Sequence, residues 1–140
     1  MARRRYLLQP CSTNLDWLGH VNNVAFGEYL QEARVDVLTQ WRDGLTHPEL
    51  SMMAAKQEIE YRRPLHFRSE PVAIDSWIAR VGTTSFTFVQ EIREPDGDVL
   101  YAGDRCVVVQ VDNASERPTA LSDPRREHLL SYADEGSWTP

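Results

Sequence analysis

The residues best suited to chemistry lie in one short polar segment just before the expected start of a helix. Asp16 stands seven residues before Asn23, and Gly19 between them allows the chain to turn back tightly. The first N–H groups of a helix lack intrahelical partners and carry about half a positive charge, so the backbone N–H of Asn23 could hold a developing oxyanion. The carboxylate of Asp16 could act as general base for water or attack a carbonyl carbon to give an anhydride. These residues predict chemistry at a carbonyl group, with both routes open.

A single long helix is predicted to position this segment. After a polar loop at residues 12–21, apolar residues recur at three- and four-residue spacing; they are Phe26, Tyr29, Leu30, Ala33, Val37, Leu38 and Trp41. Asn22 or Asn23 can cap the helix by accepting a first-turn N–H. Gly44 is placed to end the helix in a left-handed conformation, and Pro48 prevents it from resuming.

Strands are predicted on both sides of the helix. The first covers residues 4–11 and ends near Pro10. Four more follow where the hydrophobic period changes to two, at residues 57–63, 71–81, 84–94 and 98–111. Phe86, Phe88 and Ile92 alternate with polar residues, so their strand has one apolar face. This order predicts an α+β fold with a five-stranded antiparallel sheet around one long central helix.

Turn and cap residues complete this arrangement. Pro95-Asp96-Gly97 supplies the turn of a hairpin between the last two strands. Ser122 or Asp123, before Pro124, is expected to start a short C-terminal helix. We therefore expect one domain over residues 1–140, with the short helix and a tail from about residue 122.

The composition excludes several classes of protein. A net charge of −6 disfavours non-specific nucleic-acid binding. No apolar run approaches the ~18–20 residues that span a bilayer, and the start Met1-Ala-Arg-Arg-Arg lacks the features of a secretory signal. We expect a cytoplasmic protein without nucleic-acid or membrane partners.

Cysteine and histidine usage argues against a metal or another cofactor. Cys11 and Cys106 lie in apolar strand-like segments and are expected to be buried thiols; a disulfide between them is the alternative. The four histidines, His20, His47, His66 and His128, show no ligand spacing. The sequence also lacks a Gly-rich phosphate loop and the Gly-x-Ser-x-Gly elbow of α/β serine hydrolases.

Four separated blocks, matching in order, resemble the signature of the hotdog-fold thioesterases. They are Asp16-Trp-Leu-Gly-His-Val-Asn-Asn23, Tyr29-Leu-Gln-Glu-Ala-Arg34, Tyr61-Arg-Arg-Pro-Leu65 and Val81-Gly-Thr-Thr-Ser85. The resemblance runs from about residue 5 to residue 112 and is closest to the bacterial 4-hydroxybenzoyl-CoA thioesterase-like and long-chain acyl-CoA thioesterase groups. The His-Val-Asn-Asn block also resembles the plant acyl-carrier-protein thioesterases. The resemblance implies a hotdog fold that hydrolyses an acyl-CoA or acyl-carrier thioester to a free carboxylic acid and a thiol.

The resemblance also implies roles for individual residues. Those implied to be catalytic are Asp16, His20 and Asn23, and those implied to contact substrate are Gly19, Val21, Asn22, Tyr61 and Ser85. It further implies a homodimer or homotetramer, because an unpaired edge strand invites pairing with another chain. The loop and helix head of one subunit would then face the partner's strands, near Tyr61 or Ser85.

Other readings of the same residues stay open. Asp16 could serve only the turn, and His20 could orient Asp16 or substrate, or be a hydrogen-bonded loop residue. Leu18 stands where the plant enzymes carry asparagine, so this sequence departs from their full Asp/Asn/His arrangement. Other groups of the superfamily place histidine or tyrosine at the position of Asn23, so only its backbone role carries over.

Two other functions compete with hydrolysis. One is a protein that binds acyl thioesters without turnover. The retention of Asp16 argues against this function, because a buried carboxylate is costly to desolvate and a binding protein would not need it. The other is a hotdog hydratase or dehydratase, whose signature resembles Asp-x-Asn-Pro-x-His. Here three residues separate Asp16 from His20 instead of four, and neither asparagine nor proline intervenes.

Overall fold

The computed structural model describes residues 3–40 and 47–134. In chain order its elements are β1 (Arg4–Leu8), a 3-10 turn (Ser12–Asn14), α1 (Asn23–Gln40), β2 (Leu50–Tyr61), β3 (Val72–Val81), β4 (Ser85–Arg93), β5 (Leu100–Asp112), β6 (Arg117–Pro118) and α2 (Asp123–Leu130). Neither helix is long and apolar enough to cross a membrane over the residues described.

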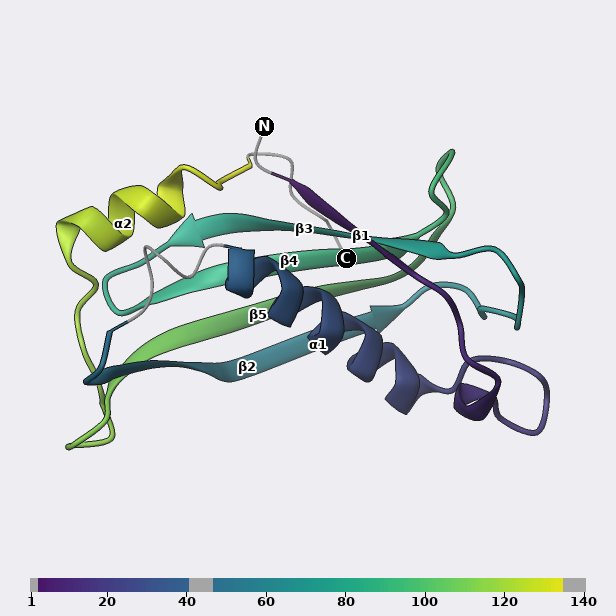
Figure 1. The fold of residues 1–140 in the computed structure, drawn as a ribbon, viewed down its shortest axis with the longest axis horizontal. Coiled ribbons are helices and arrows are strands. Elements are labelled where there is room, and N and C mark those ends of the chain that lie inside the picture. The colour runs from purple at the N-terminus through teal and green to yellow at the C-terminus, as the bar shows by residue number, and fades with distance from the viewer. Residues whose placement is uncertain (1–2, 41–46, 135–140) are drawn as a thin grey trace.

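The strands form one antiparallel sheet with α1 lying across one face (Figure 1). The strand order is β1-β3-β4-β5-β2, and the two-residue β6 pairs with β5. The sheet therefore has β1 and β2 at its two edges, although these are the first two strands in the chain. The sheet has six strands, one more than predicted because of the two-residue β6, and its packing on one helix confirms the α+β arrangement expected from the sequence.

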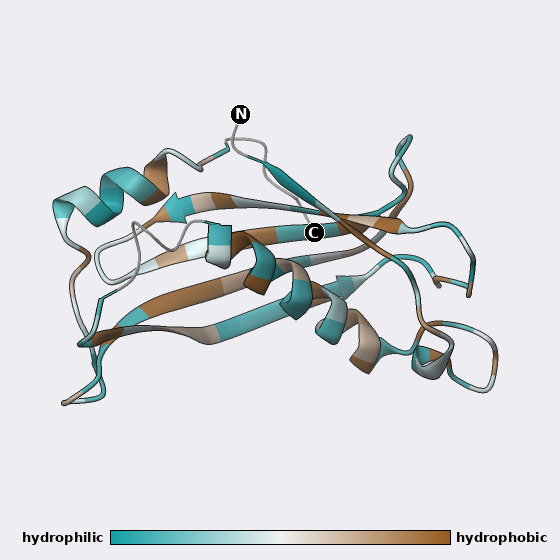
Figure 2. Cartoon of the chain, viewed as in Figure 1, coloured by the Kyte–Doolittle hydropathy of each residue, from teal (hydrophilic) through white to brown (hydrophobic). Residues whose placement is uncertain are grey.

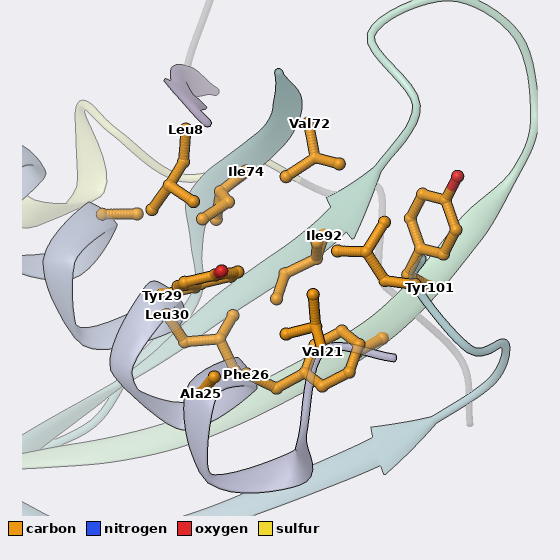
Figure 3. Close-up of a cluster of buried hydrophobic side chains, with 13 residues drawn as sticks. Leu8, Val21, Ala25, Phe26, Tyr29, Leu30, Val72, Ile74, Ile92 and Tyr101 are labelled. Atoms are coloured by element: carbon orange, nitrogen blue, oxygen red, sulfur yellow. The ribbon is translucent and has the colours of Figure 1, made fainter. Parts of the chain in front are cut away.

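Buried side chains of α1 pack on the inner face of the sheet in two groups. Near the start of α1 the buried group is Leu8, Val21, Ala25, Phe26, Tyr29, Leu30, Ala33, Leu65, Val72, Ile74, Ile92, Tyr101 and Ala102 (Figure 3). Near its end the group is Val37, Ile78, Phe86, Phe88, Cys106, Val108, Leu121 and Leu129. Phe86, Phe88 and Ile92 are all buried, which confirms the apolar face predicted for β4. Burial on this scale stabilises the domain by roughly 1.5–3 kcal/mol for each large apolar side chain.

One predicted turn and one predicted helix cap are confirmed. Gly97 lies at φ +88° in the turn between β4 and β5, a conformation that favours glycine. The side chain of Ser122 accepts the N–H of Arg125 and so caps α2, with Pro124 in the first turn.

Strand β2 differs most from its prediction, because it begins at Leu50 rather than near residue 57. Its first half, Leu-Ser-Met-Met-Ala-Ala-Lys, has no alternation and few β-branched residues, so periodicity does not reveal it. Pairing with the long strand β5 holds this half in the sheet, with a register shift between Ala54 and Lys56. Figure 2 shows a hydrophilic stretch in the middle of β2. Tertiary pairing therefore decides where this edge strand starts.

Smaller differences appear near the N-terminus and after α1. Strand β1 ends at Leu8, before Pro10, and the expectation of a buried Cys11 is wrong. Cys11 lies in the loop after the strand and is exposed, because the chain turns away from the sheet there, whereas Cys106 is buried as expected. The predicted helix positions Trp41 and Gly44 lie outside the described residues.

Candidate active site at the head of helix α1

The loop before α1 is a closed turn. Leu15 and Val21 form an isolated antiparallel bridge at its base, and the N–H of Asp16 donates to the carbonyl of His20 at 2.7 Å. Gly19 stands at φ +80°, where a residue with a side chain would be strained. The chain thus turns back between Asp16 and the helix, as its sequence predicts.

The carboxylate of Asp16 takes part in this turn with one of its two oxygens. Its Oδ1 accepts the N–H of Leu18 at 2.9 Å and the N–H of His20 at 3.0 Å. No hydrogen bond to Oδ2 occurs among the residues that the structure describes. Asp16 is half-buried in the single chain, rather than buried as expected. The loop therefore fixes the carboxylate while leaving one oxygen for a ligand.

The same loop is attached to the segment that follows β2. The N–H of Val21 donates to the carbonyl of Leu65 at 2.8 Å, and the N–H of Phe67 donates to the carbonyl of Gly19 at 3.4 Å. Between these bonds the rings of His20 and His66 meet edge to face, with centroids 4.6 Å apart. The two histidines are distant in the sequence, so no local pattern could pair them.

Asn22 caps α1 and Asn23 begins it. The Oδ1 of Asn22 accepts the N–H of Ala25 at 2.8 Å, and the N–H of Asn22 donates to the carbonyl of Asn14 at 2.9 Å. Asn23 is exposed, and its carbonyl accepts the hydroxyl of Tyr61 at 3.4 Å. The positive end of α1 thus opens at the surface beside Tyr61.

The loop, the helix head and the end of β2 line one pocket of about 480 Å³. Its lining residues are Asp16, His20, Val21, Asn22, Asn23, Phe26, Tyr61, Arg62, Arg63 and Pro64. All three candidate catalytic residues are brought together here, and Gly19 lies in the turn that supports them. The pocket therefore places a carboxylate and a helix N-terminus in one cavity.

Ser85 is the candidate that the structure places elsewhere within one chain. It begins β4, pairs with Val109, and lines a separate pocket of about 290 Å³ together with Arg80 and Thr87. Tyr61, by contrast, reaches the pocket from the same chain as Asp16. A site completed by a second subunit stays a prediction.

Sequence reasoning missed part of the pocket wall. Phe26 is only 2 % exposed and meets the ring of Tyr61 edge to face, with centroids 5.6 Å apart. Arg62 and Arg63 follow Tyr61 directly and lie in a block that resembled the thioesterases, so their positions were a usable signal. The described part of the chain holds no group of three or more His, Cys, Asp or Glu side chains suited to a metal ion.

Comparison with known proteins identifies the family. The model of the thioesterase-like superfamily matches residues 12–129. The long-chain acyl-CoA thioesterase FadM of Escherichia coli K12 is 32 % identical over 122 residues, covering 83 % of this chain and 89 % of FadM.

Solved structures agree with this assignment. A thioesterase of Thermus thermophilus, solved with coenzyme A and Zn, superimposes with a TM-score of 0.76 at 26 % identity, covering 95 % of each chain. A predicted thioesterase of Bacillus stearothermophilus shares the fold with a TM-score of 0.81 at 22 % identity, over 97 % of this chain and 100 % of that one. The chain therefore belongs to the thioesterase-like superfamily, has its hotdog fold, and is a thioester hydrolase as its motifs predicted.

Proposed function

We propose that the protein hydrolyses acyl-CoA thioesters in the Asp16 pocket and releases a free carboxylic acid and CoA. The observation that carries this proposal is the fixed position of the Asp16 carboxylate beside the N-terminus of α1 in one pocket. The similarity to FadM, a long-chain acyl-CoA thioesterase, supports CoA as the thiol. A cytoplasmic location fits such a substrate and belongs to the same proposal.

The geometry suits attack on a thioester carbonyl. The carbonyl oxygen would lie against the N–H of Asn23, where the helix dipole stabilises the negative charge that develops on it. The free Oδ2 of Asp16 would take a proton from water as the water oxygen bonds to the carbonyl carbon. The C–S bond then breaks, and the thiolate of CoA leaves and accepts a proton. Direct attack by Asp16, through an anhydride that water later opens, uses the same placement.

The test is Asp16→Asn, with hydrolysis followed by thiol release from a panel of acyl-CoA substrates. The amide oxygen can still accept the N–H groups of Leu18 and His20, so the turn and the melting temperature should be kept. We expect kcat to fall by roughly 10²–10⁴, because the base or nucleophile is lost.

The same panel separates hydrolysis from the competing functions. If the folded Asp16→Asn protein keeps kcat within a few-fold of the wild-type value, Asp16 is not the catalytic carboxylate. A wild-type protein that binds acyl-CoA without releasing thiol would instead be a thioester-binding protein. Binding is measured separately by calorimetry with acyl-CoA. A matched Asp98→Asn variant, at an exposed turn carboxylate, controls for the charge change.

A further inference from the structure

The rim of the Asp16 pocket carries two adjacent arginines whose environments differ. Arg62 and Arg63 both line the pocket. The Nε of Arg62 lies 2.8 Å from the carboxylate of Glu60, so its charge is balanced within the chain. Arg63 is exposed, and it forms no ion pair with any carboxylate in the described ranges. In a chain of net charge −6, Arg63 is therefore a cation at the mouth of the pocket without a carboxylate partner among the described residues.

The backbone presents Arg63 from a fixed position. The N–H groups of Arg62 and Arg63 both donate to the carbonyl of Tyr101, at 2.8 and 3.2 Å. On one side Tyr61 bonds to the helix head through its hydroxyl. On the other side Leu65 is 1 % exposed and anchors the chain in the core. A side chain presented in this way loses less freedom on binding, because its backbone is already ordered.

We propose that Arg63 binds a phosphate group on the thiol half of the substrate and so selects phosphorylated thioesters over unphosphorylated ones. This inference rests on the proposed function. Arg63 lines the same pocket as Asn23 and Asp16 and is exposed, so a pantetheine arm that leaves toward solvent on this side would pass its guanidinium. A guanidinium presents paired N–H donors that match phosphate oxygens and keeps its charge at any working pH.

The phosphate could belong to CoA or to the phosphopantetheine arm of a carrier protein, which share the phosphate next to pantetheine. The experiment compares acyl-CoA, acyl-phosphopantetheine and acyl-pantetheine with one acyl group, using wild type, Arg63→Gln, Arg63→Lys and the control Arg117→Gln. Arg117 is an exposed arginine on β6 and does not line the pocket. The melting temperature of each variant is measured alongside.

We expect Arg63→Gln to raise KM roughly ten- to a hundredfold for the two phosphorylated substrates and to leave kcat unchanged. For acyl-pantetheine KM should stay within about twofold, and Arg63→Lys should recover part of the loss. Arg117→Gln should match wild type throughout. An effect on acyl-CoA alone assigns Arg63 to the nucleotide phosphates, whereas an effect on both substrates assigns it to the phosphate they share.

Equal losses on all three substrates, or no loss on any, overturn the proposal for Arg63 while thioester hydrolysis stands. Calorimetric binding of free CoA and free pantetheine keeps the two proposals separate. If wild type releases no thiol but binds CoA at least about tenfold more tightly than Arg63→Gln does, hydrolysis fails and the phosphate site stands. If free CoA binds both proteins equally, the phosphate site fails.

Discussion

Asp16 and Asn22, where the loop meets the helix, each have a structural role and a place in the pocket. Asp16 uses Oδ1 to close its own turn and has Oδ2 left for chemistry. Asn22 caps α1 and lines the pocket. A turn role for Asp16, which the sequence left as an alternative, is therefore real and coexists with the role proposed in hydrolysis. The turn supplies the orientation that a catalytic carboxylate needs.

A second carboxylate, Asp104, lies buried beneath α1. It is fully buried on β5, and its Oδ2 is 3.9 Å from a guanidinium nitrogen of Arg34. Burial raises the pKa of Asp104 from 3.8 to about 6, because it outweighs the lowering effects of Gln57 and of the Arg34 charge. Because the folded state holds this proton more tightly than the unfolded state, ionisation of Asp104 opposes folding.

The pH dependence of stability should show this penalty. Below about pH 4 both states hold the proton and the penalty is absent; it grows as pH rises through the folded pKa of about 6 and then levels off. Asp104→Asn should therefore gain on the order of 2–3 kcal/mol relative to wild type between pH 4 and pH 7. Urea unfolding at several pH values measures this difference. A difference that stays flat, as expected for the exposed control Asp98→Asn, would contradict the assignment.

At the scale of the elements, the start of α1 decides the geometry of the site. The cap at Asn22 orders the first turn, which presents the N–H of Asn23, and Tyr61 at the end of β2 bonds to the carbonyl of Asn23. Helix and edge strand therefore hold the pocket between them. Anything that frays the first turn of α1 should move the oxyanion-binding group.

Removal of this cap should affect stability and turnover together. Asn22→Ala should cost about 1 kcal/mol of unfolding free energy and lower kcat at least about tenfold, because the helix head loses its order. Ser122→Ala removes the equivalent cap of α2, far from the pocket lining, and should cost similar stability with kcat unchanged. Urea unfolding and thiol release measure both effects. An equal loss of kcat in the two variants would show that stability alone controls turnover.

The elements also show what the sequence could and could not predict. Helix α1 and the hairpin at Gly97 depend on local pattern and were predicted, and Asn22 was one of the two caps predicted for the helix. The first half of β2 was missed because pairing with β5, not periodicity, makes it a strand. His66 was missed for a related reason, because a contact between distant segments brings its ring against His20. Arg63 stands next to Tyr61 in a block that the sequence analysis had singled out, so its place in the pocket could have been predicted.

At the scale of the whole molecule, the sheet ends in two edge strands, and β2 is the longer of them. β2 pairs only with β5 over the described ranges, and the side chain of Met53 on this strand is 55 % exposed. A long exposed edge of this kind favours pairing with a second chain. We therefore keep the proposal of a homodimer, or of a homotetramer built from dimers.

Light scattering at micromolar concentration tests this assembly. We expect a mass of at least twice the 16.1 kDa of one chain. Met53→Asp on the β2 edge should shift the protein toward monomer, because a buried unpaired charge is costly. Val35→Asp replaces a similarly exposed residue on α1 and should not shift it. A monodisperse and fully active wild-type monomer would contradict the assembly.

The strand order also governs when the protein can fold during its synthesis. β1 is made first, but its partner β3 begins only at Val72, and the partner of β2 begins only at Leu100. A growing chain on the ribosome thus carries two strands and the apolar face of α1 without the sheet that covers them. Since β5 ends at Asp112, all residues up to that position must leave the ribosome before the core can close. Until then the nascent chain exposes surfaces that chaperones recognise.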